Sequence, residues 1–475
     1  MRKILHLIAV VGLVVAAMFS AVSMDVSAYM KKGAEPAVPK TDEKQTYLPE
    51  TPQVDAKWTV MVYLDGDNNL ESAALDDLAE MEAVGSRNGV NVVVLMDTQS
   101  LIEGTHWYFL GEGNTHVKLT DSSVTTHHCD CELVTGQPCP GELNMGDGAT
   151  LTYFVKEAMK FAPADNYMLV LWDHGGGWYG VCWDDSSELF PDSDRTDRLT
   201  IHEAAEALCA AGLGADEKLA ILGFDACMMS MVEIAYEFRG LADYMLASVT
   251  SIPFAGWDYT PILRELTADP QMDPVTLGQI VVDSYVAYYD ECAGAGFKGM
   301  TWAGLSLVDL SRVTDLVLGP AGEGGMNAVA TELMTIVQDS KYRGYVAQAI
   351  QSLTPVILTY GQQFAFVDIG NLLEQLGEKI PDLQATTGRA LDLLAPAVVY
   401  VRYVENDNWG TMVDTCGMSV YFPIGWNYVY EDYGFETYEE SEAAGALPYY
   451  GLDFASDTLW DEMILGFSQT YDAGT

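Results

Sequence analysis

Five short runs of consecutive apolar residues constrain the fold of this chain more than any other feature. The runs are rich in β-branched and aromatic residues, several end in Asp or Gly, and they span residues 58–66, 90–98, 167–175, 219–227 and 244–250. Continuous apolarity, rather than alternation with polar residues, indicates strands that are covered on both faces. The runs therefore predict a mainly parallel β-sheet that lies between layers of helices.

Segments with helical spacing of apolar residues lie between these runs. They span residues 70–85, 150–161, 200–212 and 228–240. This alternation of strands and helices predicts an α/β fold, a doubly wound α/β/α sandwich. In such sheets the chemistry lies outside the carboxyl ends of the strands, so we expect functional residues where the apolar runs end.

The composition excludes several classes of protein. The chain of 475 residues has 23 Lys and Arg against 69 Asp and Glu, a formal net charge of −46, while 49% of its residues are hydrophobic. This apolar content suffices for a large core and excludes global disorder. The negative charge excludes nucleic acid as a partner and disfavours anionic lipid surfaces, and it favours basic peptides and metal cations.

The N-terminus has the pattern of an export signal. Arg2 and Lys3 precede an almost wholly apolar stretch, residues 4–22, and small residues that suit cleavage follow. We predict a signal peptide over residues 1–28 and a secreted or extracytoplasmic protein without stable membrane insertion after its removal. A retained anchor helix is the alternative, because the stretch is close to membrane-spanning length. Composition further predicts a linker or propeptide over 29–57, one folded domain over 58–467 and a tail over 468–475.

Two of the strand ends carry residues with catalytic potential. His174 lies at the end of the run that starts at residue 167, and three glycines, residues 175–177, come directly after it. Glycines there let a substrate backbone approach closely and offer N–H donors. Cys227 precedes a segment with helical spacing, where a helix dipole would lower the pKa of the thiol. A thiolate with a nearby imidazole is the minimal apparatus for acyl transfer, although each residue alone is more often a capping or buried side chain.

Six segments extend this pattern over most of the chain. They are VYLDGDNNLE (62–71), DHGGGWYGVCWDDSS (173–187), LTIHEAAEAL (199–208), FDACMMSMVEIAYE (224–237), AGWDYTPIL (255–263) and GMSVYFP (417–423). Together they resemble the clostripain family of secreted cysteine endopeptidases, in the caspase-like group with gingipains, legumains and caspases. That group places a His-Gly pair after one apolar strand and the nucleophilic Cys after the next, in the order found here. The resemblance covers about residues 58–467.

The resemblance implies a caspase-like α/β/α sandwich and a role for each candidate residue. Cys227 would be the nucleophile and His174 the general acid and base, with the backbone amides of Gly175 and Cys227 as the oxyanion hole. Asp225 corresponds to a family residue in the S1 pocket, where a carboxylate favours Arg or Lys at P1. Asp258 is a weaker second candidate for that pocket. A helix-capping carboxylate is the alternative for Asp225.

One departure from the family pattern leaves the substrate open. Related sequences usually carry an acidic or amide residue after the strand at 244–248, whereas this chain has Val249, Thr250 and Ser251. The leading hypothesis is a monomeric endopeptidase that cleaves proteins and peptides after basic residues; Arg is the expected P1 residue, and cleavage after Lys stays open. The alternatives are the same dyad with a non-basic P1 preference, or an inactive exported protein that binds calcium or a surface. The intact His174, Gly175 and Cys227 argue against an inactive protein.

A polar segment between the two catalytic candidates contains two arginines. Residues 191–198 include Arg195 and Arg198 and lack apolar periodicity, which predicts an exposed loop that is easily cut. The resemblance implies that the chain cuts itself in this interval, after a basic residue, and leaves two chains that stay packed together. An ordinary surface loop whose arginines balance nearby aspartates is the alternative.

The chemistry requires no cofactor, but three acidic segments bear on calcium and surface charge. Residues 65–71 place oxygens at alternate positions, as a calcium loop does, but they lack the later glutamate of such a loop. Because the segment lies between a strand and a helix, Asn68 or Asn69 is instead expected to cap the helix. The acidic run 431–442 predicts a surface loop. A denser acidic group comprises Asp184, Asp185, Asp192, Asp194 and Asp197. Two interpretations of this group stay open: a Ca²⁺ site, because some clostripain relatives require calcium, and a solvated loop.

Eight cysteines occur in a chain with an export signal. Cys129, Cys131 and Cys139 form a dense cluster with His127 and His128 that would suit zinc by ligand type. Export favours a disulfide from Cys129 or Cys131 to Cys139, and the second Cys pair of a zinc knuckle is missing. The scattered cysteines either pair or are buried thiols; they are Cys182, Cys209, Cys292 and Cys416.

Overall fold

The computed structural model describes residues 52–53, 55–99, 104–111, 143–185, 197–294, 303–352, 366–404, 415–422, 449–464 and 466. All of them belong to one compact unit, Pro49–Thr475. The predicted signal peptide, most of the predicted linker and the predicted tail lie outside these residues. None of the helices in the described part of the chain has both the length and the apolarity that a membrane crossing requires.

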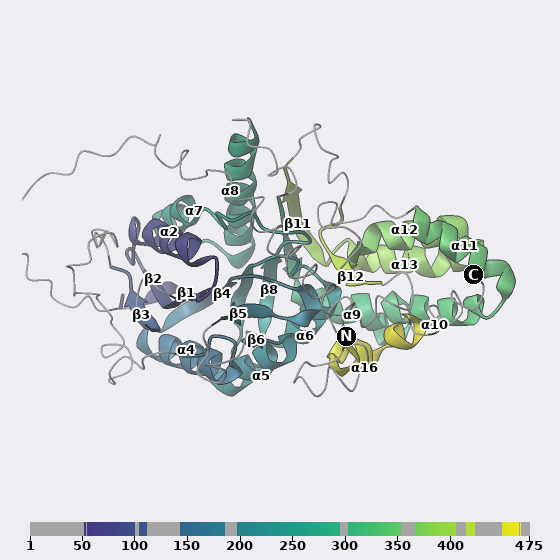
Figure 1. Ribbon diagram of the computed structural model, residues 1–475, viewed down its shortest axis with the longest axis horizontal. Coiled ribbons are helices and arrows are strands. Elements are labelled where there is room, and N and C mark those ends of the chain that lie inside the picture. The colour runs from purple at the N-terminus through teal and green to yellow at the C-terminus, as the bar shows by residue number, and fades with distance from the viewer. Residues whose placement is uncertain are drawn as a thin grey trace, which may run out of the picture. The chain divides into compact units, whose positions relative to one another are not determined.

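A mixed sheet of eight strands forms the centre of this unit. Its strands are β1 (Ala56–Gly66), β2 (Val90–Thr98), β3 (His106–Phe109), β4 (Ala164–Trp172), β7 (Leu219–Asp225), β8 (Ala242–Ala247), β9 (Gly304–Asp309) and β11 (Val398–Tyr403). Their spatial order is β11-β9-β8-β7-β4-β1-β2-β3. The strands β8, β7, β4, β1 and β2 are parallel, whereas β3, β9 and β11 are antiparallel to their neighbours. The five parallel strands are the five that the apolar runs predict (Figure 1).

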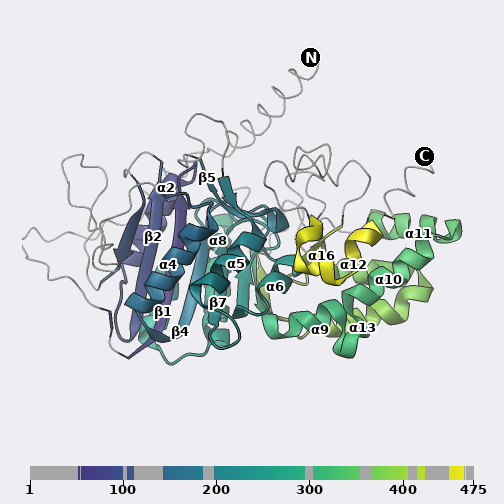
Figure 2. The ribbon, with the colours of Figure 1, turned by 90° about the horizontal axis from the view of Figure 1, so that it is seen from below.

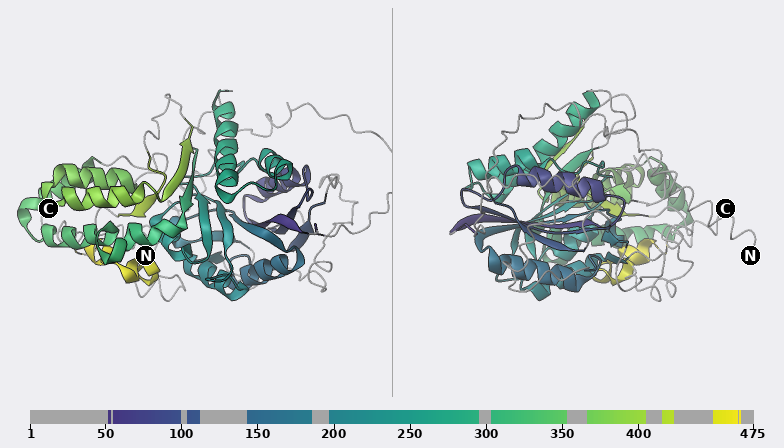
Figure 3. Two further views of the ribbon diagram at one scale, coloured as in Figure 1. Left: turned by 180° about the vertical axis from the view of Figure 1, so that it is seen from behind. Right: turned by 60° about the vertical axis from the view of Figure 1, so that its left-hand side comes forward.

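Helices cover both faces of the sheet. One face carries α2 (Glu71–Glu82), α7 (Tyr259–Ala268) and α8 (Pro274–Gly294), and the other carries α4 (Gly148–Phe161), α5 (Ile201–Ala211) and α6 (Val232–Phe238). The right-hand view of Figure 3 shows the sheet between these two layers. The predicted α/β/α sandwich with a mainly parallel sheet is therefore confirmed.

The continuous apolar runs are explained by these two layers. Successive side chains of a strand point to opposite faces, so a strand between two helix layers needs apolar residues at every position. In β1, Met61 and Tyr63 belong to the core under α4 and α5, whereas Val60 and Val62 belong to the core under α2, α7 and α8. All four residues are at most 3% exposed.

A helical part follows the sheet along the chain. It contains α9 (Val313–Leu318), α10 (Gly325–Val337), α11 (Ser340–Gln351), α12 (Ile369–Lys379), α13 (Gln384–Leu394) and α16 (Asp453–Asp457), with a small sheet of β10 (Phe366–Asp368) and β12 (Ser419–Tyr421). The helices α9 and α16 both contact α6. Figure 2 shows α6 between the helices over the sheet and this helical part. The helix α6 therefore joins the two parts of the core.

A short hairpin lies at the edge of the sheet where the parallel strands end. Its strands are β5 (Val181–Asp184) and β6 (Asp197–Leu199), and β5 follows a 3₁₀ turn at Gly177–Tyr179. The helix α5 begins directly after β6, with Thr200 and Glu203 forming a reciprocal capping box. The hairpin thus links the end of β4 to the helix that leads into β7.

Candidate active site

The carboxyl ends of β4 and β7 bring the two predicted catalytic residues to one edge of the sheet. Trp172, the last residue of β4, is paired with Asp225, the last residue of β7. The Asp173 N–H donates to the Asp225 carbonyl oxygen at 3.3 Å. His174 and Cys227 each lie two residues beyond this pair. The structure thus places both side chains at neighbouring strand ends.

Gly175 brings the two strand ends into backbone contact. A Cβ atom added to Gly175 would lie 2.2 Å from the Cys227 carbonyl oxygen and 2.8 Å from the Cys227 nitrogen. Such distances exclude any side chain at this position, because the neighbouring atoms belong to a backbone that cannot move aside. The two backbones proposed to supply the oxyanion hole, those of Gly175 and Cys227, therefore lie against each other.

The Cys227 thiol lies among hydrogen-bond donors of the segment that follows β8. Its sulfur accepts the Ile252 N–H at 3.2 Å, and a bond to the Ser251 side chain adds to this. Burial raises the pKa of the Cys227 thiol to about 11, while the bonds to Ile252 and Ser251 oppose this rise. The segment that departs from the family pattern, residues 249–251, therefore includes a residue that contacts the sulfur of Cys227.

The prediction that a helix dipole lowers the pKa of the Cys227 thiol is wrong. The helix α6 begins only at Val232 and has seven residues, so Cys227 does not lie at its N-terminus. The intervening residues turn away from helical geometry: Met228 has a positive φ of 63°, and its N–H donates to the Thr250 carbonyl oxygen at 2.8 Å. A positive φ outside glycine is a strained conformation that often marks functional sites.

His174 is held as a neutral imidazole. Its Nε2 lies 2.9 Å from the Asn69 Oδ1, and burial lowers the pKa of the His174 side chain to about 4. With the pKa of the thiol raised and the pKa of the imidazole lowered, both groups are uncharged near neutral pH. The Cys227 thiol and the His174 imidazole therefore both rest uncharged.

The loop between β1 and α2 contacts His174 and its neighbour, which the sequence did not indicate. Asn69 contacts His174, and the Asn68 Nδ2 donates to the Asp173 carboxylate at 2.8 Å and to the Trp183 carbonyl oxygen at 2.9 Å. The prediction that Asn68 or Asn69 caps the helix is wrong. The N-cap residue of α2 is Leu70, and no side chain in the described part of the chain caps it. The Asn68 Oδ1 instead accepts the Leu70 N–H, one position before the helix.

Asp225, the predicted S1 carboxylate, is 3% exposed and lies at the end of β7. Its Oδ2 accepts the Trp257 N–H at 2.9 Å and the Tyr259 hydroxyl at 3.0 Å, and its Oδ1 has no hydrogen-bond partner among the described residues. These contacts exclude the alternative of a carboxylate that caps α6. Burial raises the pKa of Asp225 to about 7.

A second carboxylate lies beside Asp225. A Cβ atom added to Gly256 would lie 2.8 Å from the Asp225 Oδ2 and 2.9 Å from the Asp77 Oδ2, so both side chains face this glycine. Asp77 is 2% exposed and accepts the Trp172 Nε1–H at 2.6 Å. Sequence reasoning missed Asp77. The available signal was a carboxylate within the apolar stripe of α2, whose other buried members are Ala73, Ala74, Leu78 and Met81.

Asp258 lies next to this carboxylate pair without belonging to it. It is the N-cap residue of α7, between Trp257 and Tyr259, both of which contact Asp225. Burial raises the pKa of Asp258 to about 6, and Arg264 opposes this rise. Its own side chain is half-buried at the start of the helix.

The structure separates the two arginines of the predicted cleavage interval. Arg195 lies outside the described residues, whereas Arg198 is the middle residue of β6 and is half-buried. The Arg198 guanidinium lies 3.7 Å from the centroid of the Tyr179 ring, and its Nε donates to the Tyr179 carbonyl oxygen at 3.2 Å. Arg198 is therefore held in a strand by its backbone and its side chain.

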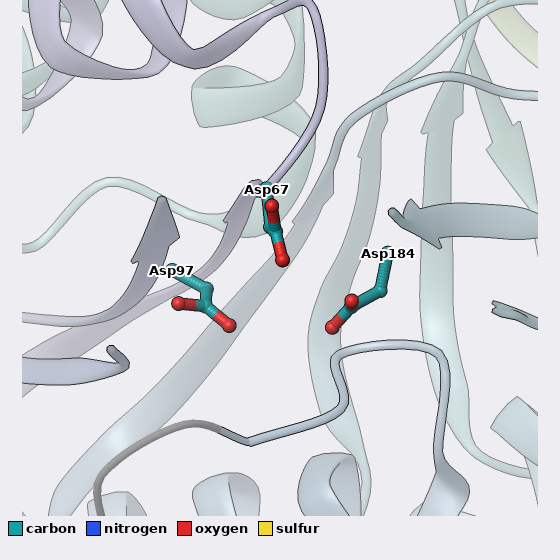
Figure 4. Close-up of side chains that lie close together, drawn as sticks. All are labelled: Asp67, Asp97 and Asp184. Carbon is teal, nitrogen blue, oxygen red and sulfur yellow. The ribbon is translucent and has the colours of Figure 1, made fainter. Parts of the chain in front are cut away.

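Three aspartates meet in one place, and two of them, Asp67 and Asp184, come from the calcium-related segments. The side chains of Asp67, Asp97 and Asp184 point into a common space from the loop after β1, the end of β2 and the end of β5 (Figure 4). All three are buried, and each offers one oxygen that lies within 4.8 Å of the others. Asp192, Asp194 and the run 431–442 lie outside the described residues, so the other predicted acidic loops are not tested.

The five described cysteines are free thiols: Cys182, Cys209, Cys227, Cys292 and Cys416. Cys182 and Cys292 are buried, as one of the two alternatives for the scattered cysteines predicts. Cys129, Cys131 and Cys139 lie outside the described residues, so their predicted disulfide stays a prediction.

Comparisons with known proteins agree with this geometry. The model of the peptidase C11 family, the clostripain family, matches residues 62–466. Clostripain from Hathewaya histolytica is 28% identical over 277 residues, which cover 51% of this chain and 50% of that protein, so the match spans about half of the relative's length. An inactive zymogen of a C11 protease from Parabacteroides distasonis has a TM-score of 0.55 at 21% identity and covers 87% of this chain and 99% of its own.

A second solved structure supports the same fold. It is a secreted C11 cysteine protease from Bacteroides thetaiotaomicron in complex with an irreversible peptide inhibitor, with a TM-score of 0.54 at 21% identity. The likeness covers 82% of this chain and 99% of that one. The caspase-like α/β/α architecture implied by the sequence motifs is thereby confirmed.

Proposed function

The chain belongs to the clostripain family of cysteine peptidases, and from this premise we propose that it hydrolyses peptide bonds with Cys227 as nucleophile and His174 as general acid and base. The observation that carries the proposal is the contact between the two strand ends, where Gly175 lies against the Cys227 backbone. Gly175 directly follows His174, so the contact brings the segment of the proposed base next to the proposed nucleophile. The two backbone amides that we propose for the oxyanion hole belong to these same two residues, Gly175 and Cys227.

The neutral resting pair defines the order of proton transfers. The His174 imidazole takes the thiol proton as the Cys227 sulfur attacks the scissile carbonyl carbon, and the backbone amides of Gly175 and Cys227 stabilise the oxyanion. The imidazolium then gives the proton to the leaving amine, and a thioester remains on Cys227. A water molecule that gives its proton to His174 attacks the thioester, and the thiolate takes the proton back as the acid product leaves.

The segment after β8 lowers the barrier to the first step. The transient thiolate lies in a buried site, which disfavours its charge. The Ile252 N–H and the Ser251 side chain bond to the sulfur and lower the pKa of the thiol. We therefore assign them the stabilisation of the thiolate.

We propose a preference for Arg or Lys at P1, with Asp225 as its determinant. The described residues form no ion pair with Asp225, so the described chain provides it with no cation. The Asp225 Oδ1 is buried without a hydrogen-bond donor from the described residues. A guanidinium would provide both a donor and a charge. Burial and the charge of Asp225 raise the pKa of the neighbouring Asp77 carboxyl well above its usual range, so Asp77 favours its neutral form and leaves the charge to Asp225.

A thiol-reactive probe tests the site and the specificity together. A probe with Arg at P1 should label the wild type at Cys227, and a matched probe with Leu at P1 should label it much more slowly. Cys227→Ala should abolish labelling and hydrolysis, while Cys209→Ala, which removes an exposed free thiol, should leave both unchanged. Labelling by the Leu probe alone would favour a non-basic P1 residue. Hydrolysis by Cys227→Ala would refute the cysteine mechanism.

We further propose self-cleavage after Arg195 in a secreted, monomeric enzyme. Arg198 is a poorer cleavage site because its backbone is paired in β6 and its side chain is stacked on Tyr179. Mass spectrometry of the wild type should find a fragment that ends at Arg195, and Arg195→Ala should lose it while retaining hydrolysis of peptides. Cys227→Ala should stay intact over this interval. An N-terminal sequence of the secreted protein that begins near residue 29 would support the signal peptide.

A further inference from the structure

A buried tyrosine hydroxyl near the proposed S1 carboxylate has no hydrogen-bond partner among the described residues. It belongs to Tyr285 of α8, whose side chain is 0% exposed. Most buried polar groups in proteins are hydrogen-bonded, because a buried group that lacks a partner lowers the stability of the folded state. Tyr285 thus carries an unfavourable group that the described part of the fold does not use.

Tyr289, one turn further along α8, shows where Tyr285 lies. The two rings pack edge to face, with their centroids 4.8 Å apart. The Tyr289 hydroxyl donates to the Gly256 carbonyl oxygen at 2.8 Å, and a Cβ atom added to Gly256 would lie 2.8 Å from the Asp225 Oδ2. Tyr285 therefore packs against the residue that holds the segment facing Asp225.

The Tyr285 hydroxyl also lies near the proposed nucleophile. Burial raises the pKa of this hydroxyl well above its usual range, and the charges of Asp225 and Cys227 raise it further. The hydroxyl is nevertheless hydrogen-bonded to neither side chain. Tyr285 therefore presents a neutral, unpaired hydroxyl close to both the specificity carboxylate and the reacting thiol.

Asp225 has a corresponding unpaired oxygen. Its Oδ2 accepts two hydrogen bonds, whereas its Oδ1 is buried without a donor from the described residues. A carboxylate oxygen can only accept hydrogen bonds, and a tyrosine oxygen can accept as well as donate. Two buried oxygens in one region that both lack a donor point to a ligand group with several N–H donors.

We propose that the Tyr285 hydroxyl is a specificity determinant that accepts a hydrogen bond from the guanidinium of a P1 arginine, while Asp225 provides the counter-charge. This inference rests on the proposed function. A guanidinium presents five N–H donors in a planar fork, so it can bond to two oxygens in different directions at once. A lysine ammonium carries its three donors on a single nitrogen. Tyr285 therefore favours Arg over Lys.

A P1 side chain can reach these two groups only after the residues around them move apart, since both are at most 3% exposed. Residues 251–256 are suited to such a movement, because they belong to no helix or strand. They contact Cys227 through Ile252 and face Asp225 through Gly256. We therefore expect this segment to be displaced when a P1 arginine binds.

The first test measures the stability of the full chain with Cys227→Ala, so that self-cleavage plays no part. Tyr285→Phe should raise the midpoint of thermal unfolding, because it removes a buried hydroxyl that no described residue satisfies. Tyr289→Phe is the matched comparison on the same helix, and it should lower the midpoint because it removes the bonds to Gly256 and Pro253. A Tyr285→Phe chain whose midpoint does not rise, or which fails to fold, would overturn the proposal.

The second test measures the binding of peptides to the same chains by calorimetry. Tyr285→Phe should weaken the binding of a peptide with Arg at P1 about tenfold and should affect a matched Lys peptide less, because it removes a hydrogen bond to a charged group. A matched Leu peptide should bind as before. Tyr153→Phe, which removes a hydroxyl from α4 on the opposite face of the sheet, should bind all three peptides like the parent.

Two outcomes of the binding test would contradict the proposal. Unchanged binding of the Arg peptide, or an equal loss for the Arg and Leu peptides, would overturn the role of the Tyr285 hydroxyl. Equal losses for the Arg and Lys peptides, with the Leu peptide unaffected, would overturn the preference for a guanidinium.

Hydrolysis by the chain with Cys227 intact separates this inference from the proposed function. Tyr285→Phe should lower kcat/KM for an Arg peptide about tenfold and should hardly change it for a Leu peptide. A wild type that prefers Arg and is unaffected by Tyr285→Phe would overturn this inference alone. A wild type that hydrolyses no peptide would contradict the proposed function, and the stability and binding measurements would still decide the role of Tyr285.

Discussion

At the scale of single residues, the surroundings of His174 determine the pH range in which it can accept a proton. Burial lowers the pKa of the imidazole to about 4, and the Asn69 amide faces its Nε2 without carrying a charge. Above that pH the imidazole is a base over the whole physiological range. An acidic side chain in place of Asn69 would change this.

Asn69→Asp should raise the pKa of His174, because a carboxylate 2.9 Å from the ring nitrogen stabilises the imidazolium. The acidic limb of kcat/KM should shift upward by about one pH unit. Asn69→Ala should instead lower kcat about tenfold with little change in KM. The thermal midpoint should hardly change in either variant, since Asn69 is exposed. A pH profile of Asn69→Asp identical to that of the wild type would show that Asn69 does not act on the catalytic imidazole.

Asp225→Asn should lower kcat/KM for Arg peptides by an amount that corresponds to about 2–5 kcal/mol of lost transition-state stabilisation, because a buried guanidinium would lose its counter-ion. The pKa of Asp225 is raised to about 7, and only the ionised form attracts a cation. The rate on Arg peptides should therefore rise as the pH increases through about 7, and the variant should lack this limb. Asp243→Asn, at an exposed position of β8, serves as the control. Equal losses for Arg and Leu peptides would assign Asp225 a structural role.

At the scale of the elements, the approach of β4 to β7 depends on the absence of a side chain at Gly175. Gly175→Ala should abolish hydrolysis, because a methyl group 2.2 Å from the Cys227 carbonyl oxygen must push the two strand ends apart. Gly240→Ala is the matched control, since a Cβ there meets no atom within 4 Å. The rate of probe labelling at Cys227 provides the measurement, and normal labelling of Gly175→Ala would contradict the close contact.

Strands with an uninterrupted apolar run could be predicted from the sequence, and the other strands could not. The strands β1, β2, β4, β7 and β8 lie inside the sheet, and each leaves such a run. The strand β9 is also inside the sheet and buried, but Gly304 and Ser306 interrupt its apolar residues. The edge strand β11 has no fully buried residue, and β3 has only four residues. Such strands leave no pattern that periodicity can detect. The helix α6 is shorter than its apolar spacing suggests, because residues 228–231 turn at Met228 instead of continuing the helix.

Of the candidate site, the sequence predicted only the residues that directly follow strands. His174 and Cys227 follow strands, and their neighbourhood follows from strand order. The contacts of His174 with Asn69 and of Asp225 with Tyr259 join residues from separate loops and helices. No local pattern encodes such contacts. Asp77 was missed because a carboxylate on an amphipathic helix is normally assigned to its wet face.

At the scale of the whole molecule, buried carboxylates make stability depend on pH. Glu233 of α6 accepts the Tyr421 N–H and the Tyr449 hydroxyl, each at 2.8 Å, and so joins α6 to two distant segments. Burial raises the pKa of Glu233 to about 7 from an ordinary 4.5. The folded state therefore holds a proton that the unfolded state has lost between these values. The stability that comes from this proton is complete below pH 4.5 and is lost as the pH rises towards 7.

Glu233→Gln should remove this dependence, because Gln keeps the acceptor oxygen and cannot ionise. Relative to the wild type, the free energy of unfolding of the variant should increase by up to about 3 kcal/mol between pH 4.5 and pH 7.5. Urea unfolding at both pH values provides the measurement. Glu217→Gln, at an exposed position, should follow the wild type. Parallel behaviour of Glu233→Gln and the wild type would mean that Glu233 is already ionised in the folded state.

The position of the cleavage interval between β5 and β6 has a consequence for how the molecule folds. A cut within 186–196 would leave β1, β2 and β4 on one fragment and β7 and β8 on the other, while β4 and β7 remain paired in the centre of the sheet. Folding of the intact chain is a unimolecular reaction, whereas the cut molecule could re-form only by association of two fragments. The recovery of the cut enzyme after denaturation would therefore depend on protein concentration. In dilute solution the cut enzyme would stay active only for as long as its two fragments unfold slowly.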